Sequence, residues 1–228
     1  MLELKLSMIR TILTRVQIGF PKFREDWTKS PAIYSSHTLR IAGHPVMEDW
    51  EKNYMDKLAE IASSNGGKVL ELGYGMGISA KAVQSHGVED HYVIECHPDV
   101  VARGIGDFHN EIQENKFHIL SGFWEDITPL LRDEMFDGIL FDTYPLKQEE
   151  VHSNHFWFFK EAYRLLKPGG ILTYYSDEVS NFSPDHMAKL KEAGFVEKNI
   201  KHEVIEVNPP EDCEYWQEKT MIAPIIKK

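Results

Sequence analysis

The feature that most constrains the fold is a regular alternation of short apolar runs and helix-like stretches after residue 67. Strands are predicted at 68–72, 92–94, 117–120, 136–142 and 171–175, and two late runs, 202–207 and 221–226, are expected to pair. Helices are predicted near 79–85, from 98 toward 115, and at 156–166. Because parallel strands need a crossover between them, this order predicts an α/β fold with a doubly wound, Rossmann-like sheet.

The first 45 residues break this pattern and are expected to form an N-terminal helical extension or lid. Apolar residues between 2 and 16 recur as they do on one face of a helix. Such an extension can cover a site, pair with a second copy in a homodimer, or pack on the body. From Val46, apolar residues recur at three- and four-residue steps, which predicts a helix up to residue 64 and a main domain over 46–228.

Composition argues against several classes of partner. The chain has 228 residues, with 36 acidic against 25 basic side chains and no basic block, so no nucleic acid is expected to bind. No apolar run approaches the length of a membrane span, and two cysteines are too few for a disulfide framework, which favours a reducing cytoplasm. His152 and His155 lack a third ligand nearby in the sequence, so no metal site is expected.

A glycine-rich motif, Glu-Leu-Gly-Tyr-Gly-Met-Gly at 71–77, stands where the first strand of the predicted sheet passes into a helix. Glycines allow a tight turn and a close approach to a ligand. A dinucleotide fingerprint needs a small residue where this chain has Ile78. The motif is instead typical of S-adenosylmethionine-dependent methyltransferases, and a purely structural turn is the alternative. Its candidate cofactor-binding residues are Glu71, Gly73, Gly75 and Gly77.

Residues at the ends of the next two strands suit a nucleoside. Glu95 lies 22 residues after the first glycine of the motif, where an acid binds ribose hydroxyls in nucleoside-binding βαβ units. A surface acid is the alternative, and Cys96 and His97 either line the adenosine pocket or only pack. Trp124 and Glu125 suit stacking on adenine and accepting its amino group, although Trp124 fits a hydrophobic core equally well.

Asp142 and Tyr144 lie at the carboxyl end of the fourth predicted strand. Ligands of open α/β sheets bind outside the carboxyl ends of the strands. An acid there can orient an amino or guanidino group and accept its proton, and an acid followed by an aromatic residue resembles a signature of amino-methylating enzymes. A structural aspartate at the strand end is the alternative.

Taken together, these segments resemble the guanidinoacetate N-methyltransferase family. The resemblance covers most of the chain from Leu39 onward. It is carried by residues 39–55, 66–76, 94–96, 122–126, 136–146, 164–174, 192–195 and 209–213.

The resemblance implies a set of cofactor contacts: Met47, Met55, Tyr74, Gly75, Met76, Gly77, Ile78, Ser79, Glu95, Cys96, His97, Trp124 and Glu125. It also implies that Glu51 and Asp142 grip a guanidinium, with Asp142 close to the methyl group being transferred. Two carboxylates can make bidentate hydrogen bonds to a planar guanidinium, which agrees with this implication.

The chain departs from the family in two places. The first 38 residues align poorly, and Trp27 is the candidate for the family's lid tryptophan. After the fifth strand the chain is shorter, where backbone amides in the family hold the substrate carboxylate, and the matching positions are Asp177 and Glu178. An acid repels a carboxylate, so a substrate with a neutral or cationic tail is expected. The alternative is that both side chains point to solvent.

The sequence therefore predicts an S-adenosylmethionine-dependent N-methyltransferase acting on a small guanidino compound. One alternative is an enzyme that methylates another small amine or guanidine. A non-enzymatic alternative is a cofactor-binding interaction protein with the same fold.

Overall fold

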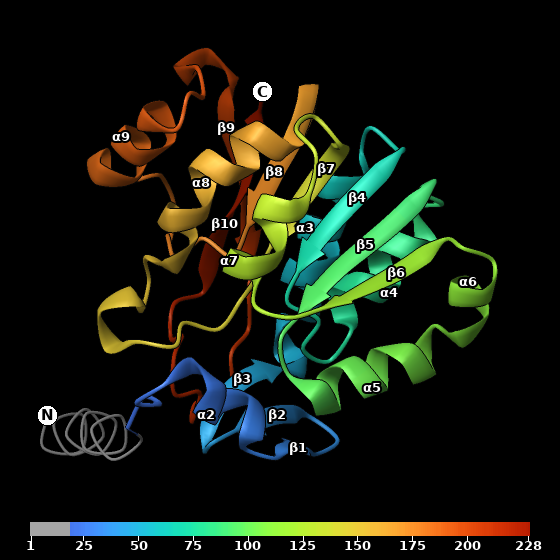
Figure 1. Ribbon diagram of the computed structural model, residues 1–228. Coiled ribbons are helices and arrows are strands. Elements are labelled where there is room, and N and C mark those ends of the chain that lie inside the picture. Colours follow the sequence, from blue (N-terminus) through green and yellow to red (C-terminus); the bar gives the residue numbers. More distant parts are fainter. Residues whose placement is uncertain (1–18) are drawn as a thin grey trace, which may run out of the picture.

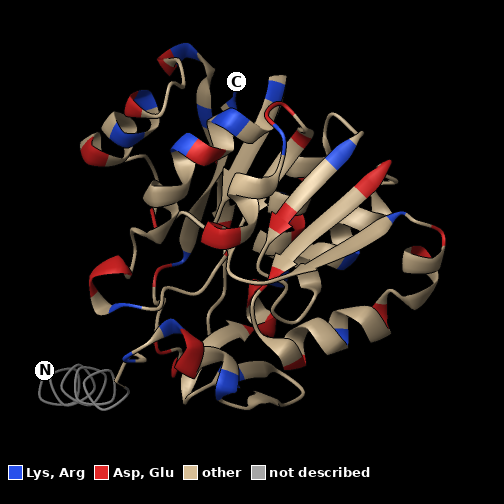
Figure 2. Cartoon of the chain, viewed as in Figure 1, with Lys and Arg blue, Asp and Glu red and all other residues tan. Residues whose placement is uncertain are grey.

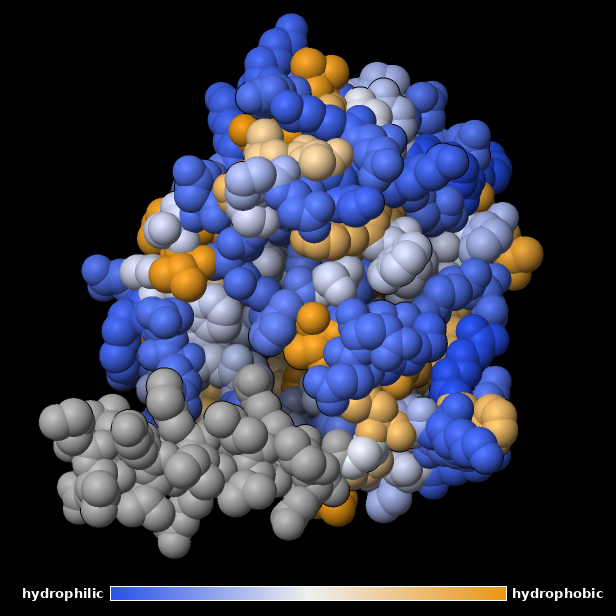
Figure 3. Space-filling model, turned by 90° about the vertical axis from the view of Figure 1, so that its left-hand side faces the viewer, coloured by the Kyte–Doolittle hydropathy of each residue, from blue (hydrophilic) through white to orange (hydrophobic). Residues whose placement is uncertain are grey.

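The computed structural model describes residues 19–228. The amphipathic helix predicted between residues 2 and 16 lies outside the described residues. No helix in the described range is long and apolar enough to cross a bilayer. The face in Figure 3 is mostly hydrophilic, with hydrophobic side chains in small groups.

A seven-stranded sheet with the order β6-β5-β4-β7-β8-β10-β9 forms the centre of the molecule (Figure 1). Strands β4 to β8 are parallel, and β10 pairs antiparallel with both β8 and β9. The strands are β4 (Lys68–Leu72), β5 (Asp90–Glu95), β6 (Phe117–Ser121), β7 (Phe136–Phe141), β8 (Leu166–Tyr174), β9 (Ile200–Glu206) and β10 (Thr220–Lys227). The predicted doubly wound α/β fold and the late antiparallel pair are confirmed.

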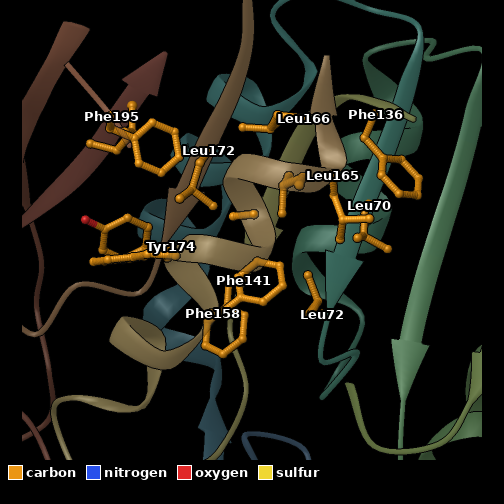
Figure 4. Close-up of a cluster of buried hydrophobic side chains, with 14 of the residues drawn as sticks. Leu70, Leu72, Phe136, Phe141, Phe158, Leu165, Leu166, Leu172, Tyr174 and Phe195 are labelled. Carbon is orange, nitrogen blue, oxygen red and sulfur yellow. The ribbon is translucent and has the colours of Figure 1, made fainter. Parts of the chain in front are cut away.

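Helices cover both faces of the sheet, which explains why its inner strands are continuous apolar runs. The helices are α3 (Lys52–Ser63), α4 (Ile78–Ser85), α5 (Pro98–Asp107), α6 (His109–Gln113), α7 (Trp124–Ile127), α8 (Asn154–Leu165) and α9 (Pro184–Glu192). Short 3-10 helices are η1 (Asp49–Glu51), η2 (Thr128–Leu130), η3 (Gln148–Glu150) and η4 (Glu197–Asn199). One core packs α8 on the sheet through Phe158 and Leu165, which meet Leu172 and Tyr174 of β8 (Figure 4), and Leu190 of α9 belongs to the same core. A second core packs α3 against the opposite face.

A small antiparallel sheet precedes α3 and lies beyond the carboxyl ends of the central strands (Figure 1). It consists of β1 (Ala32–Tyr34), β2 (Thr38–Ile41) and β3 (His44–Glu48), and α2 (Arg24–Lys29) comes before it. Ala42 and Gly43, both with positive φ, make the tight turn between β2 and β3. This sheet places residues of the N-terminal region over the edge where ligands bind in such folds.

Three sequence expectations need correction. The helix predicted from Val46 begins at Lys52, because residues 44–48 pair with β2 and 49–51 form a 3-10 turn. The described part of the predicted helical extension holds one short helix and strands, and the boundary after residue 45 falls inside β3. The helix predicted from 98 toward 115 is divided into α5 and α6.

Candidate active site

A cavity of about 510 Å³ opens at the carboxyl edge of the central sheet. Its walls come from the ends of β4, β5 and β7, from the small sheet, and from the loop of residues 207–219 between β9 and β10. Acidic residues stand at the end of β5 and in α7 and η3 around this edge (Figure 2). The location is the one expected for ligands of an open α/β sheet.

The structure brings twelve of the predicted site residues together around this cavity. They are Trp27, Met47, Glu51, Gly73, Gly75, Glu95, Cys96, Trp124, Glu125, Asp142, Tyr144 and Asp177. Nine others do not line it: Met55, Glu71, Tyr74, Met76, Gly77, Ile78, Ser79, His97 and Glu178.

The glycine motif forms the cavity wall between β4 and α4. Gly73 has φ 89°, and a Cβ atom there would lie 2.0 Å from the carbonyl oxygen of Asp142, so only glycine permits this approach to the end of β7. A Cβ on Gly75 would lie 3.0 Å from the sulfur of Met47, which comes from β3. The motif is therefore packed tightly against both the end of β7 and the small sheet.

Glu95 stands at the end of β5 with each carboxylate oxygen held by one backbone amide. Tyr74 N–H donates to Oε2 at 2.9 Å, and His97 N–H donates to Oε1 at 2.8 Å. Each oxygen retains a further lone pair for a hydroxyl donor. The apolar side chains of Ile94, Val100 and Trp124 line the same cavity. The carboxylate therefore fits the ribose of S-adenosylmethionine, and the apolar side chains fit its adenine.

Glu71 stabilises the glycine motif and does not line the cavity. Its side chain is completely buried; the Ser79 hydroxyl donates to Oε1, and His91 Nε2 lies 2.9 Å from Oε2. The carboxylate thus holds the start of α4, and its direct contact with the cofactor stays a prediction. Ser79 is engaged in the same interaction.

Three more of the predicted residues outside the cavity make contacts around it. The Tyr74 hydroxyl donates to Asp107 in α5 at 2.8 Å, and Met55 is buried in the core beneath α3. His97 Nε2 lies 2.6 Å from the carbonyl oxygen of Ser30, which ties the start of α5 to the end of α2. These contacts stabilise the cavity walls.

Glu51 and Asp142 lie far apart in the sequence, and both line the cavity. Glu51 is 3% exposed, and its Oε1 accepts hydrogen bonds from the Glu48 N–H, at 2.8 Å, and from the Tyr215 hydroxyl. Burial and the Asp142 carboxylate raise the pKa of Glu51 to about 8. Burial, with Glu71 and Asp177 nearby, raises the pKa of Asp142 to about 7. Two such carboxylates are poised to bind a cation and to take up a proton.

Trp27 closes the side of the cavity under the small sheet. Its ring is buried and stacks on Tyr144, with centroids 5.2 Å apart and planes 9° apart. His44 Nδ1 lies 3.0 Å from the Tyr144 hydroxyl. Trp27 is thus packed as part of the wall, and its role as a lid stays a prediction.

Asp177 and Glu178, paired in the sequence-based expectation, point in different directions. Asp177 lines the cavity in a left-handed conformation, and its Oδ1 lies 3.1 Å from His152 Nδ1. Glu178 turns to α9, where its Oε1 accepts the Ser183 N–H at 3.0 Å and lies 3.3 Å from His186 Nδ1. The two acids therefore have different surroundings, and of the two only Asp177 lines the cavity.

Several residues that line the cavity were not predicted from the sequence. Tyr215 and Glu214 come from the 207–219 loop, and Glu214 pairs with Arg40 of β2. Tyr175 follows β8, and Trp157 of α8 is 71% exposed at the cavity. No local pattern marks these positions, because they reach the site only through contacts distant in sequence.

Comparison with known proteins agrees with this geometry. The model of the guanidinoacetate N-methyltransferase family matches residues 21–228. Among curated proteins, a protein arginine N-methyltransferase 2 of Yarrowia lipolytica is 30% identical over 162 residues, 66% of this chain and 33% of that protein. The corresponding protein of Aspergillus oryzae is 29% identical over 199 residues, 80% of this chain and 46% of that protein. The chain spans a third to a half of the length of these relatives.

Solved structures share the fold at low sequence identity. Spermidine synthase of Thermotoga maritima superposes with a TM-score of 0.58 at 16% identity, over 83% of this chain and 65% of that chain. A SAM-dependent methyltransferase of Archaeoglobus fulgidus gives 0.56 at 15% identity, over 79% and 95%. The family match extends over nearly all described residues and includes the glycine motif, Glu95, Glu51 and Asp142. The chain belongs to the guanidinoacetate N-methyltransferase family and has a class I methyltransferase fold.

Proposed function

We propose that this chain methylates a nitrogen of a small guanidino compound. The observation that carries the proposal is a pair of carboxylates, the buried Glu51 and the half-buried Asp142, at one cavity beside the residues expected to bind the nucleoside. A planar guanidinium matches two carboxylates through parallel N–H···O bonds.

The charge of the cavity supports a cationic acceptor. Lys147 is the one Lys or Arg that lines the cavity among the described residues, and its ammonium donates to Glu150 at 2.8 Å. Within residues 19–228, seven carboxylates line the same space: Glu51, Glu95, Glu125, Asp142, Glu150, Asp177 and Glu214. The low dielectric constant of such a cavity strengthens the attraction between these carboxylates and a cation that enters it.

The two carboxylates would also prepare the acceptor for transfer. When bound, S-adenosylmethionine supplies a methyl group on a sulfonium centre. Asp142, with a pKa of about 7, would accept a proton from the acceptor nitrogen, which restores a lone pair directed at the methyl. Glu51 would hold the rest of the guanidinium in plane. In-line placement of the nitrogen and exclusion of water then account for most of the rate.

The tail of the acceptor is proposed to be neutral or cationic. Asp177 adds a carboxylate to the cavity at the end of β8, next to the strand that ends before Asp142. An acceptor that carries its own carboxylate, as guanidinoacetate does, would face repulsion from this acid. An amine-tailed guanidine would gain an ion pair there.

A peptidyl arginine is the second candidate acceptor. The curated relatives named above are protein arginine N-methyltransferases, and an arginine side chain presents the same guanidinium. The exposed Trp157 at the cavity offers a surface that a peptide could contact.

A methylation assay with a mass readout tests both candidates. The acceptors are guanidinoacetate and three guanidines on a four-carbon chain that ends in an ammonium, a methyl or a carboxylate group, together with butylamine and an arginine-containing peptide. We expect methylation of the free guanidines, with the ammonium-tailed compound turned over best. Turnover of the peptide or the amine alone would refute the proposal of a small guanidino acceptor.

A further inference from the structure

Tyr175 lines the cavity but has no role in the proposed function. It directly follows β8, and its backbone N–H donates to the carbonyl oxygen of Phe141 at 3.1 Å, one residue before Asp142. Its ring packs edge-on against Tyr54, with centroids 5.3 Å apart and planes at 80°. The side chain lines the cavity. The backbone hydrogen bond to Phe141 and the ring contact with Tyr54 hold it in place.

The hydroxyl of Tyr175 is buried and has no hydrogen-bond partner among residues 19–228. Its neighbours differ in this respect. The Tyr54 hydroxyl donates to the carbonyl oxygen of Ile222 at 2.8 Å, and the Tyr215 hydroxyl donates to Glu51. A buried hydroxyl without a partner is unfavourable, and at a ligand site its partner is expected to be the ligand.

The electrostatic surroundings of this hydroxyl indicate what kind of ligand group it meets. Burial and the carboxylates of Glu51, Asp177 and Asp142 raise the pKa of Tyr175 well above its ordinary value. The phenol therefore stays neutral and keeps lone pairs that can accept a hydrogen bond. A cation that is attracted by the three acids brings N–H donors to the same place.

We infer that the Tyr175 hydroxyl is a third acceptor-binding group, which accepts an N–H of the guanidinium held by Glu51 and Asp142. Oε1 of Glu51 already receives two protein donors, so it has little capacity left for the acceptor. An alkylguanidinium has five N–H donors, more than the remaining carboxylate oxygens bind in a good geometry. Tyr175 would thereby help to distinguish a guanidinium from an ammonium, which has three.

The inference rests on the proposed function and is tested by binding as well as turnover. Butylguanidine and butylamine are titrated calorimetrically into protein saturated with S-adenosylhomocysteine, for the wild type and for Tyr175→Phe. We expect the variant to bind butylguanidine about tenfold more weakly, the loss of one hydrogen bond to a charged group. Affinity for butylamine and for S-adenosylhomocysteine should change less than about twofold, a shift of a few tenths of a kcal/mol.

Thermal stability separates a ligand contact from a structural one. Because the hydroxyl has no partner in the part of the chain that the structure describes, its removal should not lower the melting temperature of the ligand-free protein. Tyr163→Phe is the matched control, since this ring packs on Phe195 and near Lys228 away from the cavity, and it should leave butylguanidine affinity unchanged.

Each outcome has a distinct meaning. Unchanged butylguanidine affinity in Tyr175→Phe overturns the inference while leaving the proposed function intact. An equal loss of S-adenosylhomocysteine affinity, or a clearly lower melting temperature, also overturns it and indicates a structural role. If the wild type binds no guanidine at all, the proposed function and this inference are both wrong.

Discussion

We propose that one half of the cavity binds the cofactor and the other half binds the acceptor. The chain builds this cofactor half and this acceptor half differently. The cofactor half comes from β4, β5 and the turns that follow them, so residues 73–75 and 94–96 supply it within a short stretch. The acceptor half joins Glu51, Asp142, Tyr175 and Tyr215, which belong to four separate segments. A common cofactor can be bound by a compact local motif, whereas acceptor specificity depends on how distant segments meet.

Substitution of Asp142 should separate the two halves most clearly. Asp142→Asn keeps the shape of the side chain but removes the proton acceptor, so we expect turnover to fall at least about a hundredfold. Binding of S-adenosylhomocysteine, measured by calorimetry, should be largely retained. Near wild-type turnover would show that another group accepts the proton.

The complementary substitution is in the cofactor half. Glu95→Ala removes the carboxylate expected to bind the ribose, and we expect a loss of about 1.5–3 kcal/mol in S-adenosylhomocysteine binding. The amides of Tyr74 and His97 also lose their partner, so the folded state is checked by its melting temperature. An unchanged affinity in a stable variant would contradict the assignment of Glu95.

Asp177 provides a smaller test within the acceptor half. In Asp177→Asn, the preference for an ammonium-tailed over a methyl-tailed guanidine should fall about tenfold, as expected for one charge-assisted contact. Glu178→Gln makes the same change of charge at the next residue, whose carboxylate faces Ser183 and His186, and the preference should stay the same. A preference for guanidinoacetate that neither variant alters would favour the ordinary acceptor of the family.

The last prediction concerns stability against pH. The pKa values of Glu51 and Asp142, about 8 and about 7, exceed the value of about 4 for such groups in unfolded chains. Between about pH 4 and 8 the folded protein therefore binds more protons than the unfolded chain, so the free energy of unfolding should fall as pH rises.

Thermal melts of the ligand-free protein across this pH range measure the effect. Glu51→Gln, which cannot ionise, should flatten the dependence, while the exposed Glu149→Gln should not. A dependence as steep in Glu51→Gln as in the wild type would show that this residue is not one of the groups responsible.

The sequence by itself determined the central sheet and most of the cofactor half. Strands such as β4 and β5 are marked by buried apolar runs, and Glu95 by its spacing from the glycine motif. These signals are local, because strand burial and the turn after a strand depend on residues adjacent in the chain. Glu71 shows the limit of such a signal, since its place in the motif did not reveal that its carboxylate is buried against Ser79 and His91.

The tertiary structure alone decided how the acceptor half is assembled. Met47 fitted the apolar spacing of a helix, but pairing with β2 placed it in a strand at the glycine motif. Tyr215 reaches Glu51 across 164 positions of sequence, and the different directions of Asp177 and Glu178 depend on contacts with His152 and α9. Such contacts form only when packing brings the segments together, and no periodicity within a single segment records them.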